Sequence, residues 1–356
     1  MGAYKIQSET LTGLCNAVRG KEGTTALIPT SEIASRIRAF KSGGFPNGTE
    51  WTQSNVTSGI FTAIHNANGI WVAGSNFGLY YSTDGKTWTQ SNITSGTYSA
   101  LCCAAGVWVC GSNANSAFCR STDGKNWETV TIPSNWVLHI RYAHGVWVAG
   151  HGNNGGISYS TDGMTWTRSN VTSGHVRHID NANGLWVAVS SNGLYYSTDG
   201  MTWTRSNITT SGQRVCYSGG LWVAHAKGLY YSADGMVWTQ SNITSGTFYS
   251  IRNDGGLWVS ANAVDMGNGT GLYYSTDGKI WTQSNITSGN FWAVHKSSSI
   301  WVACSEAGLY YSTDGKIWTQ SNVTSNDYRA TYNANGIWVV GGRNVGLYYS
   351  VTWEVS

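Results

Sequence analysis

Tryptophan recurs along this chain at two fixed positions of an internal repeat, and this regularity constrains the fold more than any other feature. One series lies in the motif Gly-[Ile/Leu/Val]-Trp-Val, which occurs eight times, once with Ser in place of Gly. The other lies in the motif Ser-x-Asp-Gly-x-x-Trp, which has seven complete copies. Units of 35–43 residues cannot each bury a core alone, so neighbouring units must stack. The first series consists of Trp71, Trp108, Trp147, Trp186, Trp222, Trp258, Trp301 and Trp338.

Within each unit the pattern predicts four short strands, which we call a to d in chain order. In the first complete unit they cover 61–66, 70–74, 79–82 and 87–91. An Asn-Gly pair between a and b, and an Asp-Gly pair between c and d, both favour two-residue hairpin turns. Four-stranded units at this period predict an all-β fold, an eight-bladed β-propeller of antiparallel blades.

Both ends of the repeat region can supply strand d of the last blade. The repeats begin with a d strand at 51–54, which can pair with the last c strand at Tyr348 and Tyr349 and so close the ring. Residues 351–356 also have the pattern of a d strand, but the Asp-Gly turn that should precede it is missing. The sequence leaves this choice open.

Residues 1–44 lack the repeat and form a separate predicted unit, ahead of a propeller that we assign to residues 45–356. Apolar residues recur at helical spacing between Leu11 and Val18, and a second helix is predicted over 30–40. Helices this short are not stable alone, so they should pack on each other, on the propeller or on other copies of the chain.

The run Leu-Thr-Gly-Leu-x-Asn-Ala-Val-Arg-x-Lys-x-Gly-Thr-Thr-Ala-Leu-Ile-Pro in this segment resembles leader segments in tail proteins of phages that infect Gram-positive bacteria. The resemblance covers about a tenth of the chain. It implies attachment to a larger particle through other structural proteins, and copies of the chain can also associate as a homo-oligomer.

The charge balance excludes some partners. Charged residues make up 11% of the chain, the net charge is +3, and Lys and Arg are dispersed, so we expect no nucleic-acid partner. No apolar run approaches the ~20 residues of a membrane-spanning helix, and the first residues lack the features of a signal peptide. We expect synthesis in a bacterial cytoplasm, then a virion- or particle-associated location, or an extracellular one after release. The seven cysteines lack Cys-x-x-Cys spacing and are interpreted as small buried hydrophobes, and we expect neither a metal nor a cofactor.

The Ser-x-Asp-Gly-x-x-Trp motif resembles the Asp-box of bacterial neuraminidase repeats, also found in sortilin-like receptors and other propellers. It is one residue shorter than the commoner Ser-x-Asp-x-Gly-x-Thr-Trp form. Ser and Asp side chains can satisfy turn amides, Gly accepts a positive φ, and Trp packs into the sheet. A turn-stabilising role explains every copy, and the resemblance implies the same structural role. The aspartates are Asp84, Asp123, Asp162, Asp199, Asp234, Asp277 and Asp314.

Asn-[Ile/Val]-Thr triplets follow the predicted d strands and fit the N-glycosylation pattern. Their regular placement favours a turn in the framework of the repeat instead. The triplets begin at Asn55, Asn92, Asn170, Asn207, Asn242, Asn285 and Asn322.

The copies of the repeat differ mainly in one connection. The step from the motif Ser to its Trp is always six residues, whereas the step from the Trp-Val motif to the next motif Ser ranges from ten to seventeen. Strands in a blade alternate in direction, so the variable b–c loops share one face with the d–a connections. The uniform turns share the opposite face. We therefore expect the functional site on the variable face.

Two tryptophans fall outside both series, Trp136 and Trp292, and both start a predicted strand a. Planar rings with amides and a few charges suit sugar rings or polar polymers. An alternative is that the aromatic residues at this position form a buried apolar column of Phe61, Tyr98, Phe248, Phe291 and Tyr328. The predicted ligand-binding residues are Trp136, Trp292, Tyr249, Arg177, Arg329, His175, Tyr98, Asn154, Glu306 and Arg343.

These features predict a non-catalytic binding propeller, a phage-tail or particle-associated adhesin that recognises a cell-surface glycan or a surface protein receptor. The resemblance to neuraminidases implies an alternative, a glycoside hydrolase that would draw on Arg214, Tyr249 and Glu306 with other charged residues of this face. The motifs that surround such residues in neuraminidases are absent, so we expect no enzyme activity and assign no catalytic residue. A protein-assembly scaffold is a third possibility.

Overall fold

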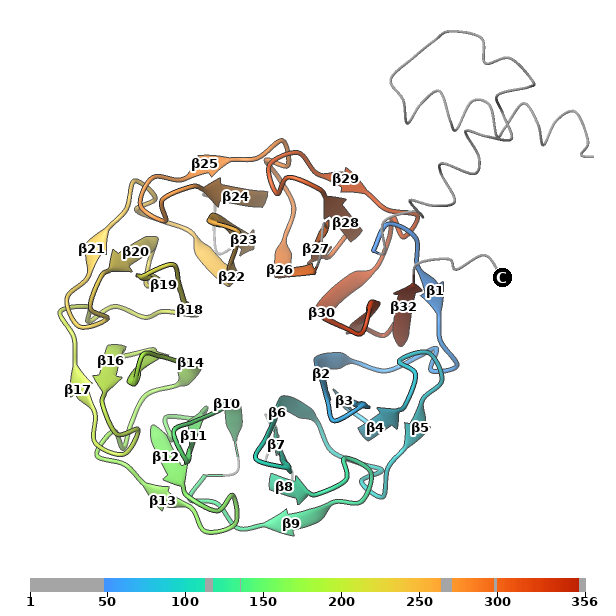
Figure 1. Cartoon of the computed structure of the whole chain (residues 1–356), viewed down its shortest axis with the longest axis horizontal. Coiled ribbons are helices and arrows are strands. Elements are labelled where there is room, and N and C mark those ends of the chain that lie inside the picture. Colours follow the sequence, from blue (N-terminus) through green and yellow to red (C-terminus); the bar gives the residue numbers. More distant parts are fainter. Residues whose placement is uncertain (1–47, 113–117, 135, 264–270, 298–299, 352–356) are drawn as a thin grey trace, which may run out of the picture. The chain divides into compact units, whose positions relative to one another are not determined.

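A computed structural model describes residues 48–112, 118–134, 136–263, 271–297 and 300–351. Within these ranges the chain forms eight four-stranded antiparallel sheets, arranged as blades around a central axis (Figure 1). The eight-bladed β-propeller predicted from the tryptophan repeat is therefore confirmed. The helices predicted within residues 1–44 lie outside the described residues.

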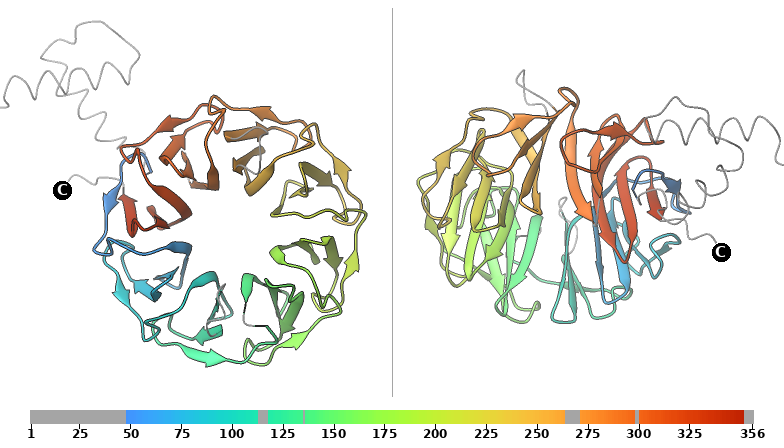
Figure 2. Two further views of the ribbon diagram at one scale, coloured as in Figure 1. Left: turned by 180° about the vertical axis from the view of Figure 1, so that it is seen from behind. Right: turned by 45° about the horizontal axis from the view of Figure 1, so that its top comes forward.

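Strands a to d follow one another outward from the axis, and the tilted view in Figure 2 shows them running steeply between the two faces of the ring. The innermost strands are β2 (Phe61–Ala67), β6 (Tyr98–Ala104), β10 (Val137–Ala143), β14 (Val176–Ala182), β18 (Val215–Ser218), β22 (Thr247–Asp254), β26 (Phe291–Ser297) and β30 (Asp327–Ala334). The second strands are β3 (Ile70–Ser75), β7 (Val107–Ser112), β11 (Val146–His151), β15 (Leu185–Ser190), β19 (Leu221–His225), β23 (Leu257–Ala263), β27 (Ile300–Ser305) and β31 (Ile337–Arg343).

The third strands are β4 (Gly78–Ser82), β8 (Phe118–Ser121), β12 (Ile157–Ser160), β16 (Gly193–Ser197), β20 (Leu229–Ser232), β24 (Gly271–Ser275), β28 (Gly308–Ser312) and β32 (Leu347–Val351). The outermost strands are β5 (Thr89–Gln90), β9 (Glu128–Val130), β13 (Thr167–Arg168), β17 (Thr204–Arg205), β21 (Thr239–Gln240), β25 (Thr282–Gln283), β29 (Thr319–Gln320) and β1 (Thr52–Gln53). Blades 1 to 7 begin with β2, β6, β10, β14, β18, β22 and β26, and blade 8 combines β30, β31 and β32 with β1.

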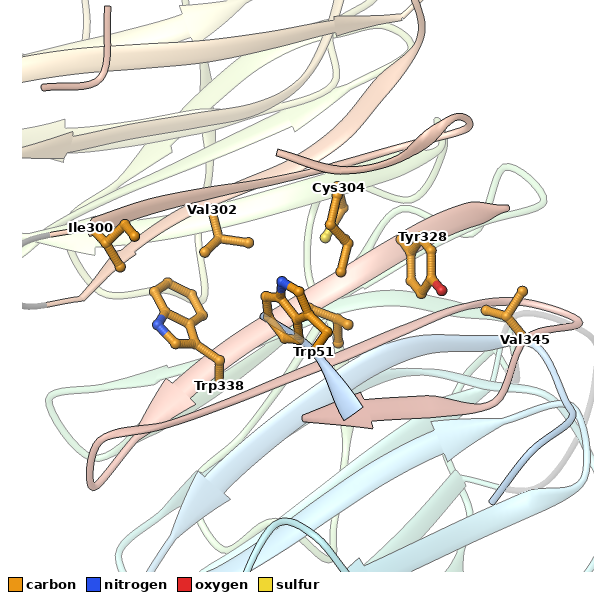
Figure 3. Packing of buried hydrophobic residues seen from close by; sticks show 9 residues of the cluster. Trp51, Ile300, Val302, Cys304, Tyr328, Trp338 and Val345 are labelled. Atoms are coloured by element: carbon orange, nitrogen blue, oxygen red, sulfur yellow. The ribbon is translucent and has the colours of Figure 1, made fainter. Parts of the chain in front are cut away.

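The ring is closed by the N-terminal strand of the repeat region. In β1, Thr52 lies opposite Tyr349 and Gln53 opposite Tyr348, in an antiparallel pair with β32. Trp51, just before β1, is 5% exposed and packs between blades 7 and 8 near Trp338 (Figure 3). Residues 51–54 therefore occupy the place of the missing d strand. Residues 352–356 lie outside the described residues.

The two predicted hairpin turns differ in the structure. At the a–b turn, Asn68 and Gly69 both have positive φ angles of 52° and 75°, as a two-residue type I′ turn requires. The c–d connection is longer than predicted, because strand β4 ends at Ser82 and β5 begins only at Thr89. The Asp84 carboxylate accepts hydrogen bonds from the Lys86 and Thr87 amides, which folds the intervening residues into a compact turn. We call this Ser-x-Asp-Gly segment the box turn.

The asparagines of the Asn-[Ile/Val]-Thr triplets join consecutive outer strands. Asn55 accepts a hydrogen bond from the Trp88 amide and donates one to the Trp88 carbonyl, both 2.8 Å long. We call this pair of bonds an asparagine clasp. The triplet asparagines therefore belong to the framework of the ring, which confirms the framework interpretation. The same two bonds join Asn92–Trp127, Asn170–Trp203, Asn207–Trp238, Asn242–Trp281, Asn285–Trp318 and Asn322–Trp51.

The core lies between adjacent blades. Side chains of strand b, such as Val302 and Cys304 in β27, pack against aromatic residues of the next blade, here Tyr328 and Trp338 (Figure 3). Burial of each large side chain contributes roughly 1.5–3 kcal/mol, so eight such layers stabilise the ring. All five members of the predicted aromatic column are at most 2% exposed: Phe61, Tyr98, Phe248, Phe291 and Tyr328.

Candidate functional site

One position on the innermost strands carries seven different residue types over the eight blades. In seven of the eight innermost strands the pairing register shifts just after the first buried residue, so that one residue has no partner on strand b. We call it the bulge residue, because such an insertion re-aims a side chain away from the regular pleat. The bulge residues are Thr62, Ser99, Leu138, Arg177, Tyr249, Trp292 and Arg329, and Gln213 takes the equivalent place ahead of β18.

Bulge residues of blades 6 to 8 contact one another. The Arg329 guanidinium lies over the Trp292 ring, 3.8 Å from its centroid. The Tyr249 ring meets Trp292 edge-to-face, with the centroids 5.0 Å apart. Asp327 holds Arg329 by a bidentate ion pair, with 2.9 Å from Nε to Oδ1 and 2.6 Å from Nη2 to Oδ2. We call these four residues the inner-rim cluster, because contacts between successive innermost strands place them on the inner circumference of the ring.

Arg177 extends this arc on blade 4. Its guanidinium donates to the Ser211 hydroxyl and the Gly212 carbonyl, each at 3.2 Å. Burial lowers the pKa of Arg177, and the nearby Tyr249 opposes that shift. The structure therefore brings together four of the ten predicted ligand-binding residues, Arg177, Tyr249, Trp292 and Arg329, which the sequence did not place at one register.

Glu306 and Arg343 lie beside the inner-rim cluster on the variable face. Glu306 is exposed in the b–c loop of blade 7, where its carboxylate accepts a 2.7 Å hydrogen bond from the Asn290 side chain. Arg343 ends β31, opposite Asp327 in the ladder, and is exposed. Both can therefore contact a ligand that is bound at the inner-rim cluster.

Three other predicted residues lie on blades 3 and 4. Trp136 begins blade 3, four blades away from Trp292 and thus on the opposite side of the ring (Figure 1). Its ring packs so closely on Gly152 that a Cβ there would approach it to 2.6 Å. The Asn154 side chain accepts a 2.6 Å hydrogen bond from the Gly174 amide, and the His175 backbone is bonded to Ser191. These residues shape the loops around blades 3 and 4 and do not join the inner-rim cluster.

Tyr98 belongs to the core and not to the exposed surface. Its ring is 2% exposed and its hydroxyl lies 3.7 Å from the Cys119 sulfur. The prediction that Tyr98 contacts a ligand is therefore wrong, because its position is that of the buried aromatic column.

The box turns use their own polar groups. In each copy the Ser hydroxyl donates to the Asp carboxylate, which in turn accepts two backbone amides. Hydrogen bonds from the Thr165 and Met164 amides lower the pKa of Asp162 to about 2. A hollow of about 260 Å³ lies beside the box turn of blade 5, lined by Tyr231, Val237 and Lys279 among others.

Charged residues on the innermost strands of blades 3 to 6 form a group that, apart from Arg214, was not predicted from the sequence. Arg141, Asp180 and Arg252 share one register, each opposite the Val that follows a motif tryptophan. Arg141 and Asp180 form a 3.0 Å ion pair, and Arg214 donates a 2.5 Å hydrogen bond to the Tyr249 carbonyl. Each arginine alone reads as a solvated strand residue, so the sequence carries no local signal that ring closure brings them together.

Two histidines lie beside these arginines. The His139 and His178 rings are 4.1 Å apart, and burial together with the neighbouring guanidinium groups holds the pKa of each well below its usual value. Both rings are therefore neutral at pH 7. Among the described residues, no three His, Cys, Asp or Glu side chains group as metal ligands.

The six described cysteines are not bonded to one another. Burial raises the pKa of Cys102, Cys103 and Cys216 to about 11 and raises that of Cys304 further. Protonated thiols are poor nucleophiles and poor metal ligands, which agrees with their interpretation as small hydrophobes. In the part of the chain that the structure describes, no helix is long and apolar enough to cross a membrane.

Comparisons with known proteins identify the fold alone. No protein-family model matches the chain, and no curated protein matches it. Among solved structures, the computationally designed Ika8 protein is 12% identical with a TM-score of 0.69, covering 85% of this chain and 100% of that one. BamB from Moraxella catarrhalis is 8% identical (TM-score 0.62, 86% and 99% covered), and YCF48 bound to D1 peptide is 15% identical (TM-score 0.55, 87% and 96% covered). At these identities, the similarity is one of architecture, and the chain shares its propeller fold with these proteins.

Proposed function

We propose that this chain is a non-catalytic binding propeller whose ligand contacts the inner-rim cluster on the variable face. The observation that carries the proposal is the chain of contacts Tyr249–Trp292–Arg329, in which three successive blades each contribute their bulge residue. The framework explains the uniform box turns and the buried column. It gives no reason for the variation of the bulge residue among the blades.

The inner-rim cluster is held in place before any ligand arrives. Asp327 and the Trp292 ring fix the Arg329 guanidinium on two sides, so little side-chain entropy remains to be lost on binding. Half-buried rings offer apolar area to the C–H face of a sugar, while guanidinium N–H groups donate to hydroxyl or carboxylate oxygens. A glycan therefore suits this surface better than a purely apolar ligand.

We further propose that the protein acts as a particle-borne adhesin. The support is the resemblance of residues 11–29 to phage-tail leaders, which would present several rings together and add avidity to weak single-site contacts. On this proposal the full chain sediments as an oligomer, and a chain lacking residues 1–44 sediments as a monomer. A monomeric full chain would contradict multivalent presentation by this segment.

A glycan array tests the ligand class. The wild-type chain should bind a subset of glycans, and Trp292→Ala should weaken that binding at least about tenfold, because it removes the ring on which Arg329 and Tyr249 both rest. Trp136→Ala is the matched control, since it deletes the same side chain on the same face four blades away. Equal losses in the two variants, or no loss in Trp292→Ala, would remove the inner-rim cluster as the site.

A protein receptor is the second candidate. YCF48, which shares the fold, has been solved bound to a D1 peptide. Binding to bacterial cells before and after enzymatic removal of surface glycans separates the two ligands. Loss of binding favours the glycan, and binding that survives deglycosylation yet still depends on Trp292 favours a protein.

The absence of catalysis is part of the same proposal. The carboxylates in and beside the inner-rim cluster are engaged, Asp327 with Arg329 and Glu306 with Asn290. Glycosidases instead need a pair of carboxyl groups placed on either side of the scissile bond. Turnover of a fluorogenic sialoside by the wild-type chain, abolished in Glu306→Gln, would overturn this part.

A further inference from the structure

The innermost strands carry more cationic side chains than carboxylates. With Arg214, just ahead of β18, they hold six cationic side chains against three carboxylates. The carboxylates are Asp180, Asp254 and Asp327, and each is already ion-paired with one cation. These strands therefore account for three net positive charges, as many as the whole chain carries. The cations are Arg141, Arg177, Arg214, Arg252, Lys296 and Arg329.

The excess is concentrated near Arg252. This side chain is exposed on β22, and its guanidinium forms neither a hydrogen bond nor an ion pair with any residue in the described ranges. Asp180, which shares its register two blades away, already accepts the Asn181 and Tyr217 amides and pairs with Arg141, and it forms no ion pair with Arg252. Its single negative charge is already offset by Arg141.

Arg214 adds to this excess. Burial, together with the charge of Arg252, lowers the pKa of Arg214 to about 10, so the two guanidinium groups repel each other. Burial raises the pKa of Tyr332 on blade 8, and the charge of Arg252 opposes that rise. The Arg252 charge is therefore felt on the inner wall of the ring well beyond its own blade.

Nearby groups do not offset this charge. His139 and His178 are neutral at pH 7, and Cys216, which shares the register of Arg252 on blade 5, keeps its proton because burial raises the pKa of its thiol. Guanidinium groups without carboxylate partners are ready-made donors for the oxygens of carboxylate and phosphate groups.

We infer that Arg252 and Arg214, together with the Arg141–Asp180 pair, form a binding site for a multivalent anionic group, phosphate or carboxylate, on the inner wall of blades 3 to 6. The site differs from the inner-rim cluster in register and in chemistry. It therefore goes beyond the proposed function, and an acidic ligand could occupy both at once.

Isothermal titration calorimetry on the full chain at low ionic strength tests the inference, with inorganic pyrophosphate and citrate as separate probes. The wild-type chain should bind at least one probe with a Kd below about 1 mM. Arg252→Gln should weaken binding about tenfold or more, because hydrogen bonds to charged groups contribute strongly. Arg252→Lys keeps the positive charge but loses the planar guanidinium donors, so its affinity for the probe should lie between those of the wild type and Arg252→Gln.

Lys227→Gln is the matched control, because the substitution removes the same charge from the chain as Arg252→Gln. Lys227 is an exposed cation in the b–c loop of blade 5. It should bind the probes as the wild type does, and so should Trp292→Ala. Binding of one probe alone supports the inference and identifies the anion as phosphate or carboxylate. The inference is overturned if the wild type binds neither probe at 10 mM, or if Arg252→Gln and Arg252→Lys bind as tightly as Lys227→Gln.

Discussion

Replacing Asn322 with alanine removes the asparagine clasp at the junction where the ring closes. Asn322 accepts a hydrogen bond from the Trp51 amide at 3.0 Å and donates one to the Trp51 carbonyl at 3.2 Å. Strand β1, which follows Trp51, has two residues and pairs with Tyr348 and Tyr349. At this junction the two sides are 271 residues apart in sequence, so non-covalent contacts alone hold them together.

The expected cost follows from these contacts. Each hydrogen bond contributes about 0.5–1.5 kcal/mol net, so the clasp contributes about 1–3 kcal/mol. Trp51 is 5% exposed, and its amide and carbonyl groups lose their partner without gaining ready access to water. We therefore expect the upper half of that range for the loss in the free energy of unfolding.

Asn242→Ala is the matched variant, because the Asn242–Trp281 clasp has the same two bonds, 2.8 and 2.9 Å long, inside the continuous part of the ring. Urea unfolding followed by tryptophan fluorescence should show similar losses for both variants. Hydrogen exchange should differ, because Asn322→Ala should expose the amides of Trp51 and Gln53 by local opening, whereas Asn242→Ala should leave them protected. Protection at β1 that is equal in both variants, or a loss below about 0.5 kcal/mol in Asn322→Ala, would refute the idea that this clasp closes the ring.

Three further predictions concern the framework. Gly156→Ala should destabilise the ring by more than about 2 kcal/mol, because a Cβ there would lie 1.9 Å from the Val171 carbonyl oxygen. Gly145→Ala, at a similar positive φ but in open space, should cost about 1 kcal/mol. Equal losses in thermal unfolding would show that the clash is not the cause. Hydrogen bonds hold the pKa of the box-turn aspartates below the unfolded value near 3.9. The stability that these bonds contribute is therefore present above pH ~4 and is lost as the pH falls toward 2. Unfolding followed by circular dichroism between pH 5 and 2 checks this prediction, and unchanged stability over that range would contradict it. Iodoacetamide at pH 8 should alkylate Cys110 and Cys304 far more slowly in the folded chain than in urea, because burial raises the pKa of both thiols. Equal alkylation rates, measured by mass spectrometry, would refute their burial.

The sequence was sufficient for the architecture because its strongest signals are local and repeated. Every Asn-Gly or equivalent a–b turn and every motif tryptophan lies within one blade, so the blade count needs no knowledge of distant contacts. At the two ends of the repeat region, the sequence does not decide which strand closes the ring. Ring closure depends on pairing between Thr52 and Tyr349, and strand patterns at both ends satisfied the same rule.

The site was predicted less completely, for physical reasons. The buried aromatic column and the half-buried aromatic bulge residues adjoin one another on strand a, so Tyr98 and Tyr249 look alike in sequence although only Tyr98 belongs to the column. The bulge itself has no residue signature on its own strand. The paired position on strand b also varies, since it is Gly74 in blade 1, Val189 in blade 4 and Cys304 in blade 7. The charges of Arg141, Asp180 and Arg252 come together only when separate blades are arranged around one axis.

The bulge residue gives the fold an unusual freedom. Its neighbours on the strand are held by the column and by the ladder, yet the position itself tolerates threonine, serine, leucine, arginine, glutamine, tyrosine and tryptophan around one ring. Each blade thus contributes one variable position, and the eight positions together determine the chemistry of one surface of the ring. Substitution at these positions can change what the ring recognises while the scaffold that displays it stays the same.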